Sequence, residues 1–328
     1  MQRVALIAGI SGQDGTCLSE FLLQQGYRIH GIVPKRRRGI ARKYVTIHTC
    51  DLGVGAGLDD LFEQVRPDEV YNLAAQSSVH GSFAAPIETA NITGLGAIRL
   101  LAAAQTHQLR AKRRVRFFQA SSCEIFGRPR EKAQDEQTPL DPLSPYACAK
   151  ALAHKQTQFF RREHGMFACN GILFHHESPY RREHFVARKI TRAAARIKLG
   201  LQEALTLGNL DVWRDWGYAG DYVKAMWLML QQPEARDYVI ATGKAHSIRE
   251  LLAEAFGCLE LDWNKFVRTN AQHFRPVDVA VRCGDASQAR AVLGWEPEVP
   301  FRDLVRMMVD HDLEIAREDL PGESASYA

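Results

Sequence analysis

The chain has 328 residues, of which 46% are hydrophobic and 24% are charged, and its formal net charge is +4. This is the composition of a globular protein with room for one large α/β unit or two modest domains, and the mild charge argues against a nucleic-acid-binding protein. No apolar run approaches the roughly 20 residues that span a bilayer, and the apolar start is too short for a signal peptide, so we expect a cytoplasmic protein.

The first predicted strand, Val4–Ala8, runs directly into a glycine-rich loop, and a helix is expected at 17–25. The glycines have GxxGxxG spacing, a variant of the dinucleotide-binding fingerprint, in which the backbone and the following helix N-terminus approach a pyrophosphate. A plain strand–helix turn is the alternative, but the strand before and the helix after provide the context that the fingerprint requires. The predicted cofactor contacts are Gly9, Gly12, Gln13, Asp14 and Gly15.

The second predicted strand, Arg28–Val33, is followed by a cationic cluster at 35–38. NAD enzymes usually carry an acidic residue at this point, which binds the ribose hydroxyls. Positive charge instead suits the 2′-phosphate of NADP, and we expect Lys35 and Arg36 to contact it. The alternatives are a solvated basic loop and a nucleic-acid site, but a nucleic-acid site needs a broader basic face with stacking aromatics.

Further strands are expected at Val45–Thr49, 69–73 and 115–119, with helices at 57–65 and 87–107 between them. This alternation predicts βαβ units, and together with the glycine loop it predicts an α/β fold: a Rossmann-type doubly wound parallel sheet. Asp51 and Leu52, which follow the third strand, are candidates for adenine contacts, although an aspartate that begins a loop is equally common.

Polar side chains follow the strand at 115–119, at the end of the sheet where α/β folds bind ligands. Ser122 is suited to hydrogen-bond a reacting oxygen. Glu124 is suited to remove a proton that a neighbouring ketone has made acidic. A glutamate that caps the next turn is the alternative.

Tyr146 and Lys150 form a YxxxK pair, which places both side chains on one face of a helix. Tyrosine is a poor base at neutral pH, because its unperturbed pKa is about 10. A nearby ammonium and an oxidised nicotinamide favour the phenolate, so we expect Tyr146 to accept a hydroxyl proton as a hydride leaves the same carbon. The two residues are also expected to contact the cofactor.

The second half of the chain has a looser pattern. A strand is expected at 169–174 and helices at 185–199, 217–230, 247–255 and 301–316. With no long linker, we predict a smaller α/β substrate lobe interleaved with the first domain. The NADP-binding Rossmann domain is assigned to 1–170 with 210–243, the lobe to 171–209 with 244–318, and a disordered tail to 319–328.

The seven cysteines are scattered, and none has CxxC or Cys/His metal spacing. That pattern is typical of reduced thiols in a cytoplasmic protein. The sequence therefore predicts neither a disulfide framework nor a metal site.

By these motifs the chain resembles the extended short-chain dehydrogenases/reductases, and within them the GDP-mannose 4,6-dehydratase family over nearly its whole length. The matching stretches are 12–15, 71–77, 119–121, 144–146, 171–174, 176–179, 188–190, 207–211, 214–217, 221–223, 225–231 and 274–276. Long matches in the same order are far more specific than either short motif.

The resemblance implies a redox-neutral dehydration of GDP-D-mannose to GDP-4-keto-6-deoxy-D-mannose. Tyr146, with Lys150, takes the O4 proton as hydride passes to NADP, and Ser122 completes the triad. Glu124 then removes the C5 proton while the 6-hydroxyl leaves as water, and hydride returns to C6. The resemblance also implies a homodimer or homotetramer.

The resemblance further implies the remaining contacts. Leu73 and Ala75 would contact the cofactor. The implied contacts to the nucleotide sugar are Ser77, His175, Lys189, Arg214, Arg275 and Asp278.

Several positions depart from the family pattern. His175 stands in place of asparagine, Trp213 in place of lysine, Asp278 in place of glutamate and Cys123 in place of serine. The stretch 36–44 is shorter than usual, which leaves dimer and tetramer both open. These departures leave open which sugar and which base the chain binds.

Three alternative functions remain at this point. A nucleotide-sugar 4-reductase or 4-epimerase needs the Ser–Tyr–Lys set but not Glu124. A 4,6-dehydratase for a different sugar nucleotide would account for the departures. A non-catalytic NADP-binding regulator would be expected to lose the Ser–Tyr–Lys set, which this chain keeps.

Overall fold

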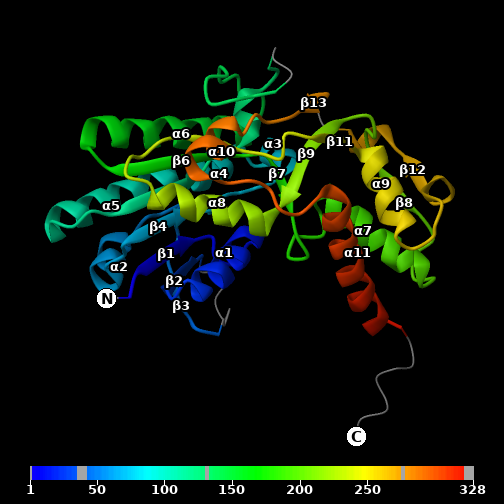
Figure 1. Ribbon diagram of the computed structural model, residues 1–328, viewed down its shortest axis with the longest axis horizontal. Helices are drawn as coiled ribbons and strands as arrows, with labels where there is room; N and C mark the ends of the chain where they lie inside the picture. The colour runs from blue at the N-terminus through cyan, green and yellow to red at the C-terminus, as the bar shows by residue number, and fades with distance from the viewer. Residues whose placement is uncertain (1, 35–42, 130–132, 275–277, 321–328) are drawn as a thin grey trace, which may run out of the picture.

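The computed structural model of the chain describes residues 2–34, 43–129, 133–274 and 278–320. Its centre is a seven-stranded parallel sheet in the order β10-β6-β5-β4-β1-β2-β3 (Figure 1). The strands are β1 (Val4–Ala8), β2 (Arg28–Val33), β3 (Val45–Thr49), β4 (Glu69–Asn72), β5 (Arg116–Ala120), β6 (Phe167–Leu173) and β10 (Tyr238–Ile240). This sheet confirms the predicted α/β fold.

Both faces of the sheet are covered by helices, which is why β1 is buried along its whole length. Successive residues of β1 belong to different cores, with Ile7 in one hydrophobic cluster and Leu6 in the other. The Ile7 cluster includes residues of α1 (Gln13–Gln24), α8 (Ala219–Gln231) and α10 (Ser287–Leu293). The Leu6 cluster includes residues of α2 (Leu58–Val65), α5 (Gly96–Ala111) and α6 (Pro145–His164).

A second lobe carries its own hydrophobic cluster, in which Ile190, Phe256 and Met308 are almost fully buried. It includes a four-stranded sheet of β7 (His175–Glu177), β9 (Trp213–Tyr218), β11 (Ala245–Ser247) and β13 (Val281–Arg282), and a β8–β12 pair (Leu205–Leu207 and Val267–Thr269). Its helices are α7 (Val186–Lys198), α9 (Ile248–Gly257) and α11 (Phe301–Glu318). Figure 1 shows this lobe beside the central sheet.

The remaining short elements lie in connections. Between β4 and α5 the chain forms α3 (Val79–Ala84), α4 (Pro86–Thr89) and a π-helix (Ala90–Leu95) where one helix at 87–107 was predicted. Three 3-10 turns occur at Cys123–Phe126, Trp263–Lys265 and Ala271–His273.

Several predicted boundaries differ from the structure. Helix α1 begins at Gln13 rather than at 17, because the last residues of the glycine motif, 13–15, already form its first turn. The helix predicted at 217–230 begins only at Ala219, since β9 continues to Tyr218. Most of the predicted tail, 321–328, lies outside the described residues. Among the described helices, none is long and apolar enough to cross a bilayer.

Candidate active site

The glycine loop is shaped by backbone packing. Gly9 has a φ of +84°, and a Cβ built on it would lie 2.8 Å from the backbone N of Ala74. A Cβ on Gly15 would lie 2.5 Å from the Cα of Ile10. Neither position accommodates a side chain, and no side chain caps α1 at Gly12. The first-turn N–H groups of α1 are therefore available to an anion.

A cavity of about 430 Å³ opens beside this loop, at the carboxyl ends of β1 to β4. Every cofactor candidate from the glycine loop, β3 and β4 lines it: Gly9, Gly12, Gln13, Asp14, Gly15, Asp51, Leu52, Leu73 and Ala75. Ser77, predicted to contact the sugar nucleotide, lines the same cavity. Lys35 and Arg36 lie outside the described residues, and Tyr146 and Lys150 are not among the lining residues.

The second lobe contributes Arg181, Arg182 and Phe185 to the lining of this cavity. The sequence analysis missed these residues, although adjacent arginines after a strand were a usable signal. The Nε of Arg181 donates to Glu177 Oε2 at 2.6 Å, and its guanidinium lies 4.1 Å from the centre of the Phe185 ring. The second lobe therefore contributes two guanidinium groups to the cavity wall, of which that of Arg181 is paired with Glu177.

Asp14 faces His176 across the same loop, with Oδ1 of Asp14 3.1 Å from His176 Nε2. Burial acts to raise the pKa of Asp14, but His176 and, less strongly, Arg181 outweigh it and lower the pKa well below its ordinary value. Asp14 is thus a fixed negative charge at the start of α1.

The serine–tyrosine–lysine set assembles where β5 meets α6. Pro145 occupies the first turn of α6, and Ser144 caps it by accepting from the N–H of Ala147 at 3.1 Å. Ser122 hydrogen-bonds to the Tyr146 hydroxyl. One turn further on, the Lys150 ammonium donates to the carbonyl of Ala120 at 2.7 Å.

Burial dominates the electrostatics of this set. It raises the pKa of Tyr146, although the hydrogen bond with Ser122 acts to lower it. Burial also lowers the pKa of Lys150 to about 8, against an opposing influence of Asp14. The sequence predicts a lowered pKa for Tyr146. Burial of the phenol within the protein has the opposite effect and raises this pKa.

Glu124 lies beside this set, in the 3-10 turn that follows β5. Its side chain is 12% exposed, and Oε2 accepts a hydrogen bond from Arg282 Nη2 at 2.9 Å. Arg282 Nη1 donates to the carbonyl of Cys123, also at 2.9 Å. The sequence analysis missed Arg282, and no sequence signal pointed to it, because the arginine lies in a strand of two residues.

Only some of the residues predicted to bind the substrate lie close to one another in the structure. Arg214 of β9 donates to Asp278 Oδ1 at 2.6 Å, so these two candidates form one pair. His175 lies near the catalytic turn, with Nδ1 3.9 Å from the sulfur of Cys123. Lys189 donates instead to the carbonyl of Thr206 at 2.9 Å. Arg275 lies outside the described residues.

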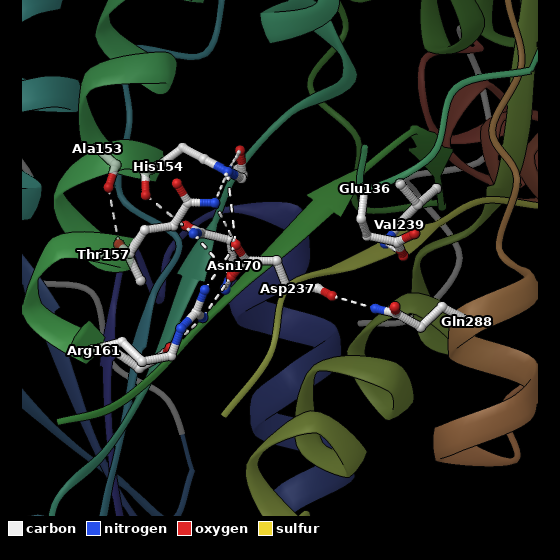
Figure 2. Close-up of polar contacts among 12 residues, drawn as sticks. Glu136, Ala153, His154, Thr157, Arg161, Asn170, Asp237, Val239 and Gln288 are labelled. Atoms are coloured by element: carbon white, nitrogen blue, oxygen red, sulfur yellow. Dashed lines mark hydrogen bonds and ion pairs between the residues drawn. The ribbon is translucent and has the colours of Figure 1, made fainter. Parts of the chain in front are cut away.

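Helix α6 is anchored near its middle by a buried polar network around Asp237 (Figure 2). Arg161 donates to both oxygens of Asp237, at 2.7 and 3.0 Å, and the side chain of Asn170 donates to the carbonyl of His154 at 3.1 Å. Burial acts to raise the pKa of Asp237, but Arg161 outweighs it and lowers the pKa. The network fixes the helix that carries the tyrosine–lysine pair.

Comparison with protein families gives a match over residues 6–308 to the model described as GDP-mannose 4,6 dehydratase. The chain is 47% identical to GDP-mannose 4,6 dehydratase 2 of Arabidopsis thaliana, over 99% of this chain and 91% of that protein. It is 42% identical to the GDP-mannose 4,6 dehydratase of Homo sapiens, over 96% of this chain and 93% of that protein.

Among solved structures, the chain is similar to a UDP-glucose 4-epimerase of Thermus thermophilus in complex with NAD. The TM-score is 0.82 and the identity 26%, with 94% of this chain and 98% of that chain covered. It is also similar to RMD from Pseudomonas aeruginosa complexed with NADPH, with a TM-score of 0.79 and 25% identity over 95% of this chain and 100% of that chain.

Proposed function

Since this chain belongs to the GDP-mannose 4,6-dehydratase family, we propose that it converts GDP-D-mannose to GDP-4-keto-6-deoxy-D-mannose. Nucleotide-sugar dehydration is the reaction named for its relatives. The observation that carries the proposal is the position of Glu124. A carboxylate lies beside the serine–tyrosine–lysine set at the carboxyl end of β5, where dehydration needs a base for C5 and simple 4-reduction does not.

The chain uses a nicotinamide cofactor, as its solved neighbours do, and we propose that the cofactor is NADP. The fit is supported by the backbone cradle at Gly9 and Gly15, which a Cβ would fill, and by the cavity beside it. The loop and strand ends would hold the dinucleotide, with Arg181, Arg182, Lys35 and Arg36 as candidates for its phosphates. When bound, the cofactor accepts hydride from C4 of the sugar and later returns it to C6.

Tyr146 and Lys150 carry out the first proton transfer. The phenolate form of Tyr146, oriented by its interaction with Ser122, takes the proton of O4 as the C4–H bond breaks. Because burial raises the pKa of this phenol, the positive charges of Lys150 and of oxidised nicotinamide are both needed to favour the phenolate. Lys150 supplies its charge only while it is protonated, and its pKa is about 8.

Glu124 carries out the elimination. The 4-keto group makes the C5 proton acidic, and Glu124 removes it as a base. The C6–O bond then breaks, and the proton now on Glu124 leaves with the hydroxyl as water, so that the carboxylate is restored. As hydride adds at C6, Glu124 or a neighbouring group, recharged with a proton from water, returns a proton to C5. Tyr146 releases the O4 proton to water, and the cofactor would be left in its starting state.

Basic residues of the second lobe would hold the nucleotide. We propose that Arg214 and Arg275 bind the diphosphate, with Lys189 nearby, and that the paired Asp278 accepts from the guanine edge. His175 and Ser77 would contact the sugar side. In this division, residues 1–170 with 210–243 bind mainly the cofactor and 171–209 with 244–318 bind mainly the substrate. Ser77 and Arg214 of the first part would contact the substrate, and Arg181 and Arg182 of the second part would contact the cofactor.

We also propose that the chain forms a homodimer or homotetramer. Apolar side chains are exposed along neighbouring helices of one face of the first domain: Leu95, Leu109, Leu152 and Phe159. Burial of these side chains against a second copy would remove an apolar patch from water.

The test is incubation of the purified chain with NADP⁺ and GDP-mannose, followed by mass spectrometry of the sugar nucleotide. We expect the loss of one water per sugar and no net NADPH. An isomer of unchanged mass would indicate the 4-epimerase, and net oxidation or reduction would indicate the reductase alternative. An unchanged substrate would contradict GDP-mannose as the substrate and would direct the same assay to other nucleotide sugars.

A further inference from the structure

Arg282 places a buried guanidinium against the turn that carries Glu124. This arginine is 3% exposed and lies in the two-residue strand β13. One arm, Nη1, donates to the carbonyl of Cys123, and the other, Nη2, donates to Oε2 of Glu124, both at 2.9 Å. The guanidinium therefore binds the backbone of one residue and the side chain of the next, which fixes the carboxylate relative to the turn.

This contact uses only one oxygen of the carboxylate. Within the described part of the chain, Oε2 of Glu124 accepts from Arg282, and Oε1 accepts no hydrogen bond. A guanidinium stays protonated at any working pH, so Arg282 cannot itself donate or accept the catalytic proton. Oε1 is thus the oxygen available for proton transfer, and Oε2 is the one that is held.

The ion pair between Arg282 and Glu124 also offsets the free-energy cost of removing the carboxylate from water. A carboxylate taken out of water is costly unless an opposite charge and hydrogen bonds accompany it. Arg282 supplies both from β13. The other titratable groups that face Glu124 are Tyr146 of α6 and the thiol of its neighbour Cys123, and both are neutral when protonated.

A second arginine next to Arg282 has a separate partner. Arg214 of β9 is the register partner of Arg282 in the parallel β9–β13 pair. Its side chain is bound to Asp278, whereas that of Arg282 is bound to Glu124. Arg214 and Asp215 of β9 also act electrostatically on Cys123, in opposite directions. Each of the two adjacent arginines is thus ion-paired with a different carboxylate.

We propose that Arg282 is a positioning residue for the dehydration base: it holds Oε2 of Glu124 against the turn, which leaves Oε1 to take the C5 proton. This inference rests on the proposed function. It predicts that Arg282 affects the elimination and leaves the earlier oxidation at C4 nearly unchanged, because within the described residues no hydrogen bond joins Arg282 to Tyr146, Ser122 or Lys150.

The test compares Arg282→Leu and Arg282→Lys with the wild type. Arg116→Leu is the matched control, since Arg116 lies on β5 at the end of the sheet opposite Ser122 and donates to the carbonyls of Leu230 and Gln232. With GDP-mannose and NADP⁺ in D₂O, stopped-flow absorbance follows C4 oxidation as reduced nicotinamide, and mass spectrometry follows water loss. Thermal unfolding checks that each variant folds.

We expect Arg282→Leu to slow water loss about 10²-fold while C4 oxidation changes less than about threefold, so that reduced nicotinamide accumulates. Arg282→Lys should recover water loss to within about tenfold of the wild type. Arg116→Leu should preserve the ratio of the two rates. An equal loss of both rates in Arg282→Leu, or a lysine variant no better than the leucine variant, would overturn the inference.

A readout that does not need turnover separates this inference from the proposed function. Infrared difference spectra, with Glu124→Gln to assign the carboxylate stretching bands, report the hydrogen bonding of Glu124. The frequencies of these bands should change in Arg282→Leu, because Oε2 loses its hydrogen bond. If the wild type leaves GDP-mannose unchanged, the proposed function fails, whereas unaltered Glu124 carboxylate bands in Arg282→Leu would overturn the pairing.

Discussion

Two glutamates, one buried and one partly buried, lie at opposite ends of the central sheet. Glu69 begins β4 at the amino end and is 1% exposed. Glu124 lies in the turn after β5, at the carboxyl end. The carboxylate of Glu69 accepts from four side chains: Arg3, Tyr27, Tyr71 and Gln231. The carboxylate of Glu124 accepts from Arg282 alone within the described residues.

The difference separates a structural carboxylate from a reactive one. Oε1 of Glu69 accepts at 3.0 to 3.3 Å and Oε2 at 2.7 Å, so both oxygens are bound. Such a group contributes to stability and has no oxygen left for a substrate. Glu124 keeps Oε1 for a substrate, and it lies among groups that can transfer protons. The number of bound oxygens, together with the greater burial of Glu69, distinguishes the two roles.

The largest effect is expected from Glu124→Gln, which removes the base but keeps the shape. Water loss from the nucleotide sugar should fall about 10³-fold, within the range known for general acid–base groups. The free energy of unfolding should fall by only about 1–2 kcal/mol, because one hydrogen bond loses its charge. Steady-state kinetics and urea unfolding measure the two effects. Wild-type turnover in this variant would contradict the assigned role.

Glu69→Gln should show the reverse pattern. An amide has one acceptor oxygen and two donors, so it leaves the buried hydroxyl of either Tyr27 or Tyr71 without its acceptor. We expect the free energy of unfolding to fall by about 3 kcal/mol, while turnover per folded molecule stays within about twofold. Active-site titration before the kinetic assay provides the concentration of folded enzyme. A loss of turnover without a loss of stability would contradict the structural role assigned to Glu69.

Lys150 extends the comparison to a buried cation with a depressed pKa. The folded pKa is about 8 and the ordinary value is 10.5, so between these values the unfolded chain binds more protons and stability rises with pH. Below pH 8 the folded state bears the full free-energy cost of the buried positive charge on Lys150. Without nicotinamide, Lys150→Met should be more stable than the wild type at pH 7 by about 2 kcal/mol, which is less than the about 3.4 kcal/mol that the shift implies, because the bond to Ala120 is lost. The difference should shrink as the pH rises towards about 10; a constant difference would contradict this account.

The central sheet was predictable because its strands give a clear signal. Val4–Ala8 is a continuous apolar run that ends at a glycine loop, and strands covered on both faces have this pattern. Short strands have no readable period, which is why β13 went unpredicted. The contact of Glu124 with Arg282 joins residues 158 positions apart, so no local pattern contains it. The raised pKa of Tyr146 was also missed, since the depth of burial follows from packing and not from the YxxxK spacing.

The most direct test of the account follows deuterium from D₂O into C5 of the sugar, with the wild type, Glu124→Gln and Glu69→Gln in parallel. We predict one deuterium at C5 and the loss of one water for the wild type and for Glu69→Gln. For Glu124→Gln we predict C4 oxidation, seen as reduced nicotinamide, without deuterium at C5. Deuterium incorporation at the wild-type rate in Glu124→Gln would contradict the assignment of this carboxylate as the base.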